Sequence, residues 1–353
     1  MKVINARNVN EAYVIGLGYL RAVGEHQDSR VGRVLVAPEP VTTVYRVPAE
    51  RVLFNVQRDA NPFFHLFEGL WMLAGRNDVE WIERYNSTFK QFSDDGVIFN
   101  AAYGYRWRKY FGEVDQLEDL ISMLLYDPDT RRAVLSMWDP WADFDQDGKD
   151  FPCNLNIAFR VSHGRLHMTV FNRSNDMIWG AYGANAVHMS MLHEYMAAMT
   201  HNMMGNYYQV SNNMHAYVDI LNKVGTPDPH PCCPYDRGAV RFKKLVDDPQ
   251  TFDEDLHEFV DNEHENPLRR YSNSFFTEVA APMKYAWDNH KAKNYPKALE
   301  HISKIQATDW QLACRQWITR RMEAHATKTD QKRRTSSKVA HDSADSGADG
   351  SGT

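Results

Sequence analysis

The sequence predicts an α+β fold, in which helices pack against a β-sheet. Two stretches, 155–161 and 166–170, place apolar residues at every second position, the period that is typical of strands. A third stretch, 61–75, is apolar on nearly every face, as expected of a buried helix. With 353 residues and 43% hydrophobic content, the chain can bury a large core. We expect one domain over residues 1–325.

Local patterns predict further elements along the chain. The polar loop Asp28–Arg33 precedes an apolar strand at Val34–Ala37, and the polar run Asp127–Arg132 precedes another at Ala133–Met137. Gly75 supplies the end of the helix that begins near Asn61.

Two more elements and a tail complete the prediction. Gly180–Asn185 leads into a helix over Ala186–Met199, and Asn213–Tyr217 is interpreted as extended. From Ala326 the sequence offers almost nothing to bury, so we expect 326–353 to form a disordered polar tail.

The predicted hairpin brings a thiol close to a cation. Its apolar faces match when Val161 pairs with Leu166, Phe159 with Met168, and Ile157 with Val170. This register sets Cys153 across from Ser174 and within one residue of Arg173. A fixed guanidinium favours thiolate over thiol, so Cys153 is a candidate nucleophile. The alternative is that Cys153 is a buried small hydrophobe, as free cysteines usually are.

Glu68 lies in the middle of the apolar helix and is a candidate proton-transfer group. A carboxylate among aromatic rings is costly unless it is paired or hydrogen-bonded. The alternatives are a glutamate on the helix surface and one held in a structural ion pair.

Other polar groups match anion and sugar ligands. Arg30, Arg131 and Arg132 lie just before predicted strands, where their guanidinium groups could bind a phosphate. The alternative is that these polar runs are solvated surface turns, which is the more usual case. Asn185 offers a donor and an acceptor to a pyrimidine edge, and His215 and Tyr217 share one face of an extended segment.

Composition excludes several classes of function. A net charge of −6 gives no support to a broad nucleic-acid surface. Four cysteines make a poor disulfide framework, and the sequence contains no long apolar run, so we expect a cytoplasmic protein with no membrane partner. His230, Cys232 and Cys233 are crowded in a proline-rich run without a partner cluster, which favours a structural loop, and we expect no metal.

Taken together, these motifs resemble the thymidylate synthase superfamily, which includes phage-type deoxypyrimidine hydroxymethylases. The resemblance spans about residues 12 to 220. The motifs that carry it are, in chain order, Arg30, Glu68–Trp71, Tyr103–Arg108, Asp127–Arg132, Pro152–Cys153, Arg173–Asp176, Asn185 and His215–Tyr217.

The resemblance implies a large mixed sheet packed against helices, with one sheet face forming the interface of a homodimer. It also implies that Cys153 adds to C6 of a pyrimidine nucleoside monophosphate and that C5 then attacks 5,10-methylenetetrahydrofolate, the co-substrate. Glu68 would relay protons, and Tyr103 would assist near the C5 proton.

The same resemblance assigns the binding residues. Arg30, Arg173 and Ser174 would hold the 5′-phosphate, together with Arg131 and Arg132 from the other subunit. His215 and Tyr217 would bind the sugar hydroxyl, Asn185 the base, and Asp176 the folate pterin.

Two features bear on the final product. Methylation needs a dry, closed site. True thymidylate synthases usually carry histidine directly after the nucleophile, where this chain has Asn154. They also end in a short apolar segment that closes over the folate, where this chain has a polar tail. We therefore expect water as the last nucleophile, and Asn185 favours dUMP as substrate. Thymidylate synthesis and dCMP hydroxymethylation are the alternatives, and a non-catalytic structural or RNA-binding relative is a remote one. A hydroxymethylated product would indicate modified DNA, as in a virus, which places the enzyme in a host cytoplasm.

Overall fold

The fold is built on one mixed sheet of eight strands, seen in a computed structural model that describes residues 1–144, 147–228, 233–262 and 271–345, with side chains up to 328. The strands are β1 Lys2–Ala6, β2 Glu25–Ser29, β3 Gly32–Val36, β4 Val41–Tyr45, β5 Val134–Ser136, β6 Asn154–Ser162, β7 Arg165–Asp176 and β8 Met203–Tyr217.

The long strands β7 and β8 form the centre of the sheet. The order is β1-β4-β8-β7-β6-β5, with the β2–β3 hairpin joined to the end of β8. Pairs β1–β4 and β7–β8 are parallel and the remaining pairs are antiparallel. The predicted α+β class, with a mixed sheet packed against helices, is confirmed.

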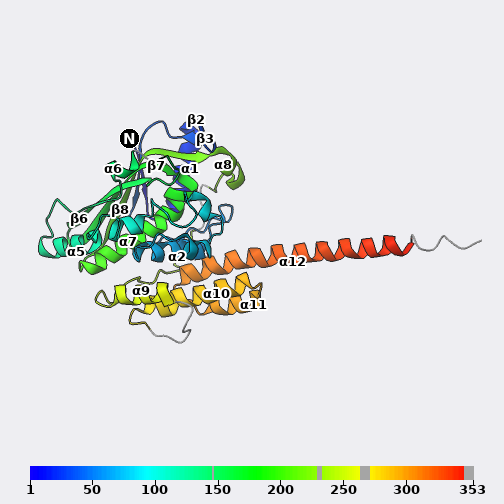
Figure 1. The fold of residues 1–353 in the computed structure, drawn as a ribbon. Coiled ribbons are helices and arrows are strands. Elements are labelled where there is room, and N and C mark those ends of the chain that lie inside the picture. The colour runs from blue at the N-terminus through cyan, green and yellow to red at the C-terminus, as the bar shows by residue number, and fades with distance from the viewer. Residues whose placement is uncertain (145–146, 229–232, 263–270, 346–353) are drawn as a thin grey trace, which may run out of the picture.

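Helices cover one face of the sheet in layers (Figure 1). Helices α2 and α7 pack against each other, α7 contacts β7 and β8, and the C-terminal helices pack beyond α2. The helices are α1 Val9–Val23, α2 Pro62–Leu73, α3 Val79–Glu83, η1 Phe89–Phe92, α4 Tyr103–Arg108, α5 Gln116–Tyr126, α6 Pro140–Asp143, η2 Met177–Ala184, α7 Asn185–Met199, α8 Val218–Val224, α9 Phe252–Asn262, η3 Phe276–Ala280, α10 Ala281–Lys291, α11 Tyr295–Ser303 and α12 Thr308–Asp345.

Local chemistry explains where the central helix α2 begins and ends. The side chain of Asn61 accepts hydrogen bonds from the backbone N–H groups of Phe63 and Phe64, and Pro62 occupies the first turn, where its missing N–H costs nothing. Gly75 adopts φ +66°, a conformation that glycine reaches without strain. Every residue of the helix is buried, as its apolar pattern predicts.

The hairpin of β6 and β7 has the predicted register over most of its length. Val161 pairs with Leu166 and Ile157 with Val170, which confirms the matching of apolar faces. A β-bulge between Asn154 and Asn156 then shifts the register by one residue. The prediction that Cys153 faces Ser174 is therefore wrong: the N–H of Arg173 donates to the carbonyl of Cys153 at 2.9 Å.

The C-terminal helix differs from the prediction of a disordered tail from Ala326. Helix α12 continues without a break to Asp345 and extends away from the body of the molecule (Figure 1). Its first half is anchored, since Arg320 and Arg321 bind the carboxylate of Asp59 at 2.7 and 2.5 Å. Once a helix is nucleated in this way, adding further residues costs little. Low hydrophobicity therefore did not imply loss of secondary structure.

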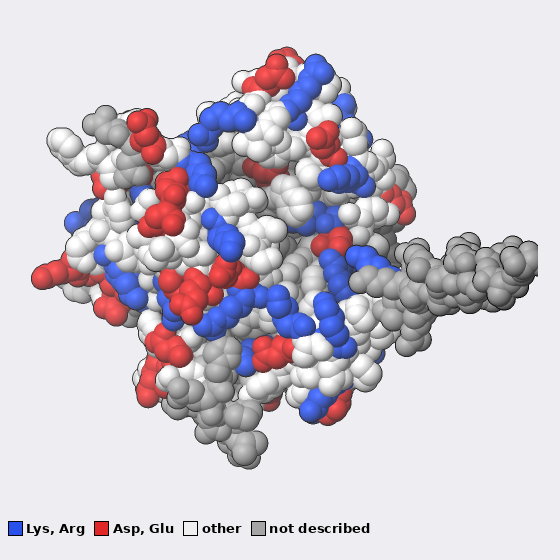
Figure 2. Space-filling view, turned by 45° about the vertical axis from the view of Figure 1, so that its right-hand side comes forward, with Lys and Arg blue, Asp and Glu red and all other residues white. Residues whose placement is uncertain are grey.

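The surface of the molecule mixes both signs of charge. Figure 2 shows Lys and Arg side chains interspersed with Asp and Glu over the face it presents, as expected for a net charge of −6. Among the described residues, no helix is both long and apolar enough to cross a membrane.

Candidate functional site

A cavity of about 320 Å³ lies where the β2–β3 hairpin meets the ends of β7 and β8. It brings together four of the predicted binding residues, namely Arg30 from the hairpin turn, Ser174 from β7, and His215 and Tyr217 from β8. The extended strand β8 turns His215 and Tyr217 to the same side, as predicted. This combination of cation, hydroxyl and imidazole suits a phosphorylated sugar.

The nucleophile candidate Cys153 is half-buried just before β6. Burial raises the pKa of its thiol, the guanidinium of Arg173 lowers it, and the carboxylate of Asp150 raises it again. Arg173 also donates from Nε to the carbonyl of Pro152 at 2.9 Å. This arginine thus fixes the backbone just before the thiol, in addition to its effect on charge. It does not line the cavity that contains Arg30.

Tyr103 reaches the same segment from the first turn of α4. Its hydroxyl accepts hydrogen bonds from the backbone N–H groups of Asn154 and Cys153, while burial raises the pKa of the phenol. The neighbouring Gly104 allows this approach, because a Cβ at that position would lie 1.9 Å from the carbonyl oxygen of Met72 in α2. Two helices and the nucleophile strand therefore converge at Tyr103.

Glu68 is 3% exposed and faces His188 of α7 across the junction of α2 and α7. The distance from Glu68 Oε2 to His188 Nδ1 is 3.6 Å. The alternative of a glutamate on the helix surface is wrong. Oε2 and both ring nitrogens of His188 are buried without a hydrogen-bond partner among the described residues.

Asn185, the candidate base-binding residue, is oriented by a buried amide network. Its Nδ2 donates to Oδ1 of Asn175 at 3.0 Å, and Nδ2 of Asn175 donates to Gln209 Oε1 at 2.7 Å and Ser211 Oγ at 3.2 Å. One N–H of Asn185 is thereby used. Its remaining N–H and its Oδ1 have no hydrogen-bond partner among the described residues, so they can bind a ligand. The network therefore fixes which end of the Asn185 amide is the nitrogen and which is the oxygen.

Asp176 ends β7 and caps the irregular helix η2. Its Oδ1 accepts from the N–H groups of Ile178 and Trp179 at 2.8 and 2.5 Å, and Oδ2 is buried without a hydrogen-bond partner in the described part of the chain. Burial raises the pKa of this carboxyl. The ring of Trp179 is half-exposed and is stacked on Arg58, 4.1 Å from ring centre to guanidinium carbon. A flat heterocycle with N–H donors fits these groups.

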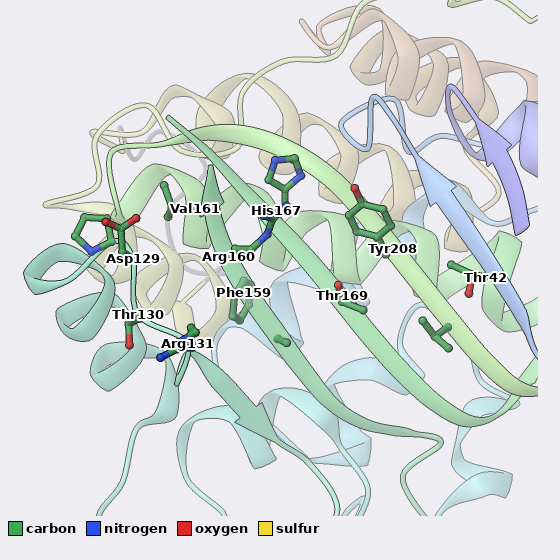
Figure 3. Close-up of a pocket in the computed structure, with 13 residues that line it drawn as sticks. Thr42, Asp129, Thr130, Arg131, Phe159, Arg160, Val161, His167, Thr169 and Tyr208 are labelled. Atoms are coloured by element: carbon green, nitrogen blue, oxygen red, sulfur yellow. The ribbon is translucent and has the colours of Figure 1, made fainter. Parts of the chain in front are cut away.

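Arg131 and Arg132 lie apart from the residues above. Both are exposed, and Arg131 lines a hollow of about 680 Å³ on the face of the sheet opposite α7 (Figure 3). Arg160, His167 and Tyr208 line the same hollow. Within one chain, the structure does not bring these two arginines to the cavity that contains Arg30.

The remaining sequence expectation concerned metal binding. His230 and Cys232 lie outside the described residues, and Cys233 is buried. Within the described ranges, no group of three or more His, Cys, Asp or Glu side chains is arranged to hold a metal ion.

Sequence reasoning missed His188 and Asn175. Asn175 is one residue of the Arg173–Asp176 motif, with no signal of its own. His188 lies in a helix that is buried on all sides, where a histidine usually has a structural role. The available signal was the spacing of three residues from Asn185 to His188, which places them on the same face of α7.

Comparison with known proteins identifies relatives of this chain. The family model described as thymidylate synthase matches residues 56–230. The chain is 48% identical over 342 residues to a deoxyuridylate hydroxymethyltransferase of Pseudomonas phage M6, covering 92% of this chain and 95% of that protein. A protein of the same name from Bacillus phage SP01 is 40% identical over 56% of this chain and 54% of its own length. Another, from Delftia phage PhiW-14, is 28% identical over 63% of this chain and 64% of its own length.

Proposed function

The chain belongs to the thymidylate synthase family, and from that premise we propose that it converts dUMP to 5-hydroxymethyl-dUMP by folate-dependent one-carbon transfer. The observation that carries the proposal is the cavity shared by Arg30, Ser174, His215 and Tyr217. It lies at the end of β7 that holds Asp176 and Arg173, and the N–H of Arg173 binds the carbonyl of Cys153. The similarity to deoxyuridylate hydroxymethyltransferases over most of the chain supports the choice of product.

Cys153 would add to C6 of the base, which makes C5 nucleophilic. The thiol has to be ionised for this step. Arg173 favours the thiolate, and it holds the backbone carbonyl of Pro152 so that the sulfur keeps a fixed position. Tyr103 hydrogen-bonds the backbone of the same segment, and a phenol held there could assist removal of the C5 proton.

The binding groups would orient the nucleotide. Arg30 and Ser174 suit the 5′-phosphate, and His215 with Tyr217 suits the sugar hydroxyl. Asn185 would donate its free N–H to O4 of uracil and accept from N3–H through Oδ1. Cytosine presents the opposite order of donor and acceptor, so the amide orientation set by Asn175 favours uracil.

The co-substrate 5,10-methylenetetrahydrofolate would supply the one-carbon unit. Asp176 fits its pterin because the buried Oδ2 has no hydrogen-bond partner among the described residues and can accept from a ring N–H. Trp179 offers a half-exposed ring for stacking next to this carboxylate.

The cytoplasm remains the proposed compartment for such an enzyme.

The enzyme would act as a homodimer in which Arg131 and Arg132 complete the partner's phosphate site. The support is their exposure on the sheet face opposite α7, where apolar side chains are also exposed: Val134 is 47% and Phe171 39% accessible. A dimer would bury this face and carry the arginines to the second chain.

Mixing two inactive variants tests this arrangement. Cys153→Ser and the double variant Arg131→Ala/Arg132→Ala should each be inactive, whereas a mixture after subunit exchange should recover about a quarter of the wild-type activity, because half of the dimers are hybrids with one intact site. A mixture that stays inactive although hybrid dimers form would contradict sharing of the site.

The reaction itself is tested by incubating the protein with dUMP or dCMP and 5,10-methylenetetrahydrofolate and determining the nucleotide mass. We expect 5-hydroxymethyl-dUMP from dUMP and no product from Cys153→Ser. A methyl product would instead identify thymidylate synthesis, and conversion of dCMP alone would identify a cytosine enzyme. No product from either base would overturn the enzymatic proposal.

A further inference from the structure

The buried pair formed by Glu68 and His188 has three polar side-chain atoms without a hydrogen-bond partner among the described residues. Both side chains are 3% exposed, and Glu68 Oε2 and both ring nitrogens of His188 have no partner within the described ranges. Their separation of 3.6 Å is too long for a good direct hydrogen bond. Buried polar atoms are almost always satisfied, so these atoms are suited to hold a small polar molecule between or beside them.

The position of His188 connects this pair to the reacting centre. Its ring lies edge-on to the ring of Tyr103, with centroids 5.9 Å apart, and the Tyr103 hydroxyl hydrogen-bonds the backbone N–H of Cys153. One helical turn earlier, Asn185 occupies the same face of α7. His188 therefore stands between the carboxylate of Glu68 and the groups proposed to hold the base and the nucleophile.

Another histidine of the same helix shows what a purely structural role looks like. His193 is fully buried, and its Nε2 lies 2.6 Å from the carbonyl oxygen of Leu166 in β7. That contact ties α7 to the sheet. The ring nitrogens of His188 have no such contact in the described structure, although His188 is also buried.

We infer that His188 and Glu68 together bind the water that becomes the product hydroxyl and accept its proton. This inference rests on the proposed hydroxymethylation. A neutral imidazole offers one donor and one acceptor nitrogen, and a carboxylate offers acceptors, so the two can orient a water and remove its proton.

After C5 has received its methylene group and tetrahydrofolate has left, the base carries an exocyclic C5=CH₂ bond and remains attached to Cys153 through C6. The water oxygen bonds to the CH₂ carbon, the C=C electrons move toward O4 as an enolate, and the water proton passes to His188 or Glu68. The enolate then re-forms C5=C6 and expels the Cys153 thiolate, with no oxidant or reductant required.

A competition experiment separates this role from packing. The exocyclic methylene is an electrophile, so an added thiol such as 2-mercaptoethanol can capture it as a thioether in place of water. We compare wild type, His188→Gln, His188→Asn and the control His193→Gln. The measurements are release of tritium from C5 of dUMP, and the ratio of thioether to hydroxymethyl product by mass spectrometry.

In both His188 variants we expect hydroxymethyl formation to fall about 10²-fold, C5 tritium release to fall much less, and the thioether share to rise. His193→Gln should lower thermal stability and leave the product ratio unchanged. If the His188 variants keep the wild-type ratio, or lose both rates equally without thioether, the inference is wrong. If wild type itself makes no hydroxymethyl product, the proposed function fails first, and the two failures remain distinguishable.

Discussion

The reactivity of Cys153 depends on two charged neighbours of opposite sign. Arg173 lowers the pKa of the thiol and Asp150 raises it, against a background of burial that also raises it. Burial raises the pKa of Asp150 to about 6, so this carboxyl loses its proton as the pH rises through 6 and then opposes formation of the thiolate.

Two substitutions should therefore shift the pH dependence of thiol alkylation in opposite directions. Arg173→Gln should move the reactivity of Cys153 to higher pH, because a stabilising cation is lost. Asp150→Asn should move it to lower pH, because a repelling anion is lost. The rate of iodoacetamide labelling at Cys153, followed by peptide mass spectrometry from pH 5 to 10, measures both. Shifts in the same direction would contradict the electrostatic assignment.

Asn175 should control how well the site selects uracil. Asn175→Leu keeps the approximate volume and removes the acceptor that fixes Asn185, leaving buried amide groups unpaired, which costs on the order of 1–3 kcal/mol. We expect a higher KM for dUMP and a smaller preference for dUMP over dCMP, measured as the ratio of kcat/KM values. Ser211→Ala is the control, since it leaves the contact between Asn175 and Asn185 intact. An unchanged kcat/KM ratio for Asn175→Leu would show that contacts other than the one with Asn175 orient the amide of Asn185.

At the scale of elements, close approach between α2 and α4 positions Tyr103. Gly104→Ala would push a methyl group against the backbone of Met72, which cannot move as a side chain tip can. We expect a loss of roughly 1–3 kcal/mol of stability and reduced activity, because Tyr103 is the adjacent residue. Denaturant unfolding and turnover measure the two effects.

Gly18→Ala is a matched control in another helix. Gly18 lies within α1, and a Cβ there meets no atom within 4 Å. This substitution should stabilise the protein by up to about 1 kcal/mol, because alanine is the better helix former. Equal destabilisation by both substitutions would mean that the contact with Met72 is not the cause.

For the whole molecule, a buried carboxyl near the start of α12 links acidity to stability. Asp309 accepts hydrogen bonds from the Tyr235 hydroxyl and the Trp310 N–H, each at 2.8 Å, and burial raises its pKa from 3.8 to about 6. The folded protein therefore keeps a proton that the unfolded chain releases. This contribution to stability is complete below about pH 4 and is lost as the pH rises through about 6.

Asp309→Asn should remove that dependence. Wild type loses this stability as the pH rises, so the free energy of unfolding of the variant minus that of wild type should increase by on the order of 2 kcal/mol between pH 4 and pH 7. Urea unfolding of both proteins across this range gives the difference at each pH. A difference that does not change with pH would contradict the raised pKa of Asp309.

Chain-local patterns predicted much of this molecule. The apolar helix around Glu68, the alternating arms that lead from Cys153 to Ser174, and the extended His215–Tyr217 segment all follow from side-chain periodicity, which depends on neighbouring residues. The ordered motifs also indicated the family. These features are properties of short segments, so neighbouring residues in the chain are enough to specify them.

Contacts between segments that lie far apart in the chain could not be predicted from local patterns. The bulge that places Cys153 opposite Arg173, and the meeting of Glu68 with His188, require strands and helices to pack in three dimensions. The contact of Arg320 in α12 with Asp59 likewise joins residues more than 250 positions apart in the chain. Periodicity fixes which face of an element is buried, whereas packing fixes which residue of another element that face meets.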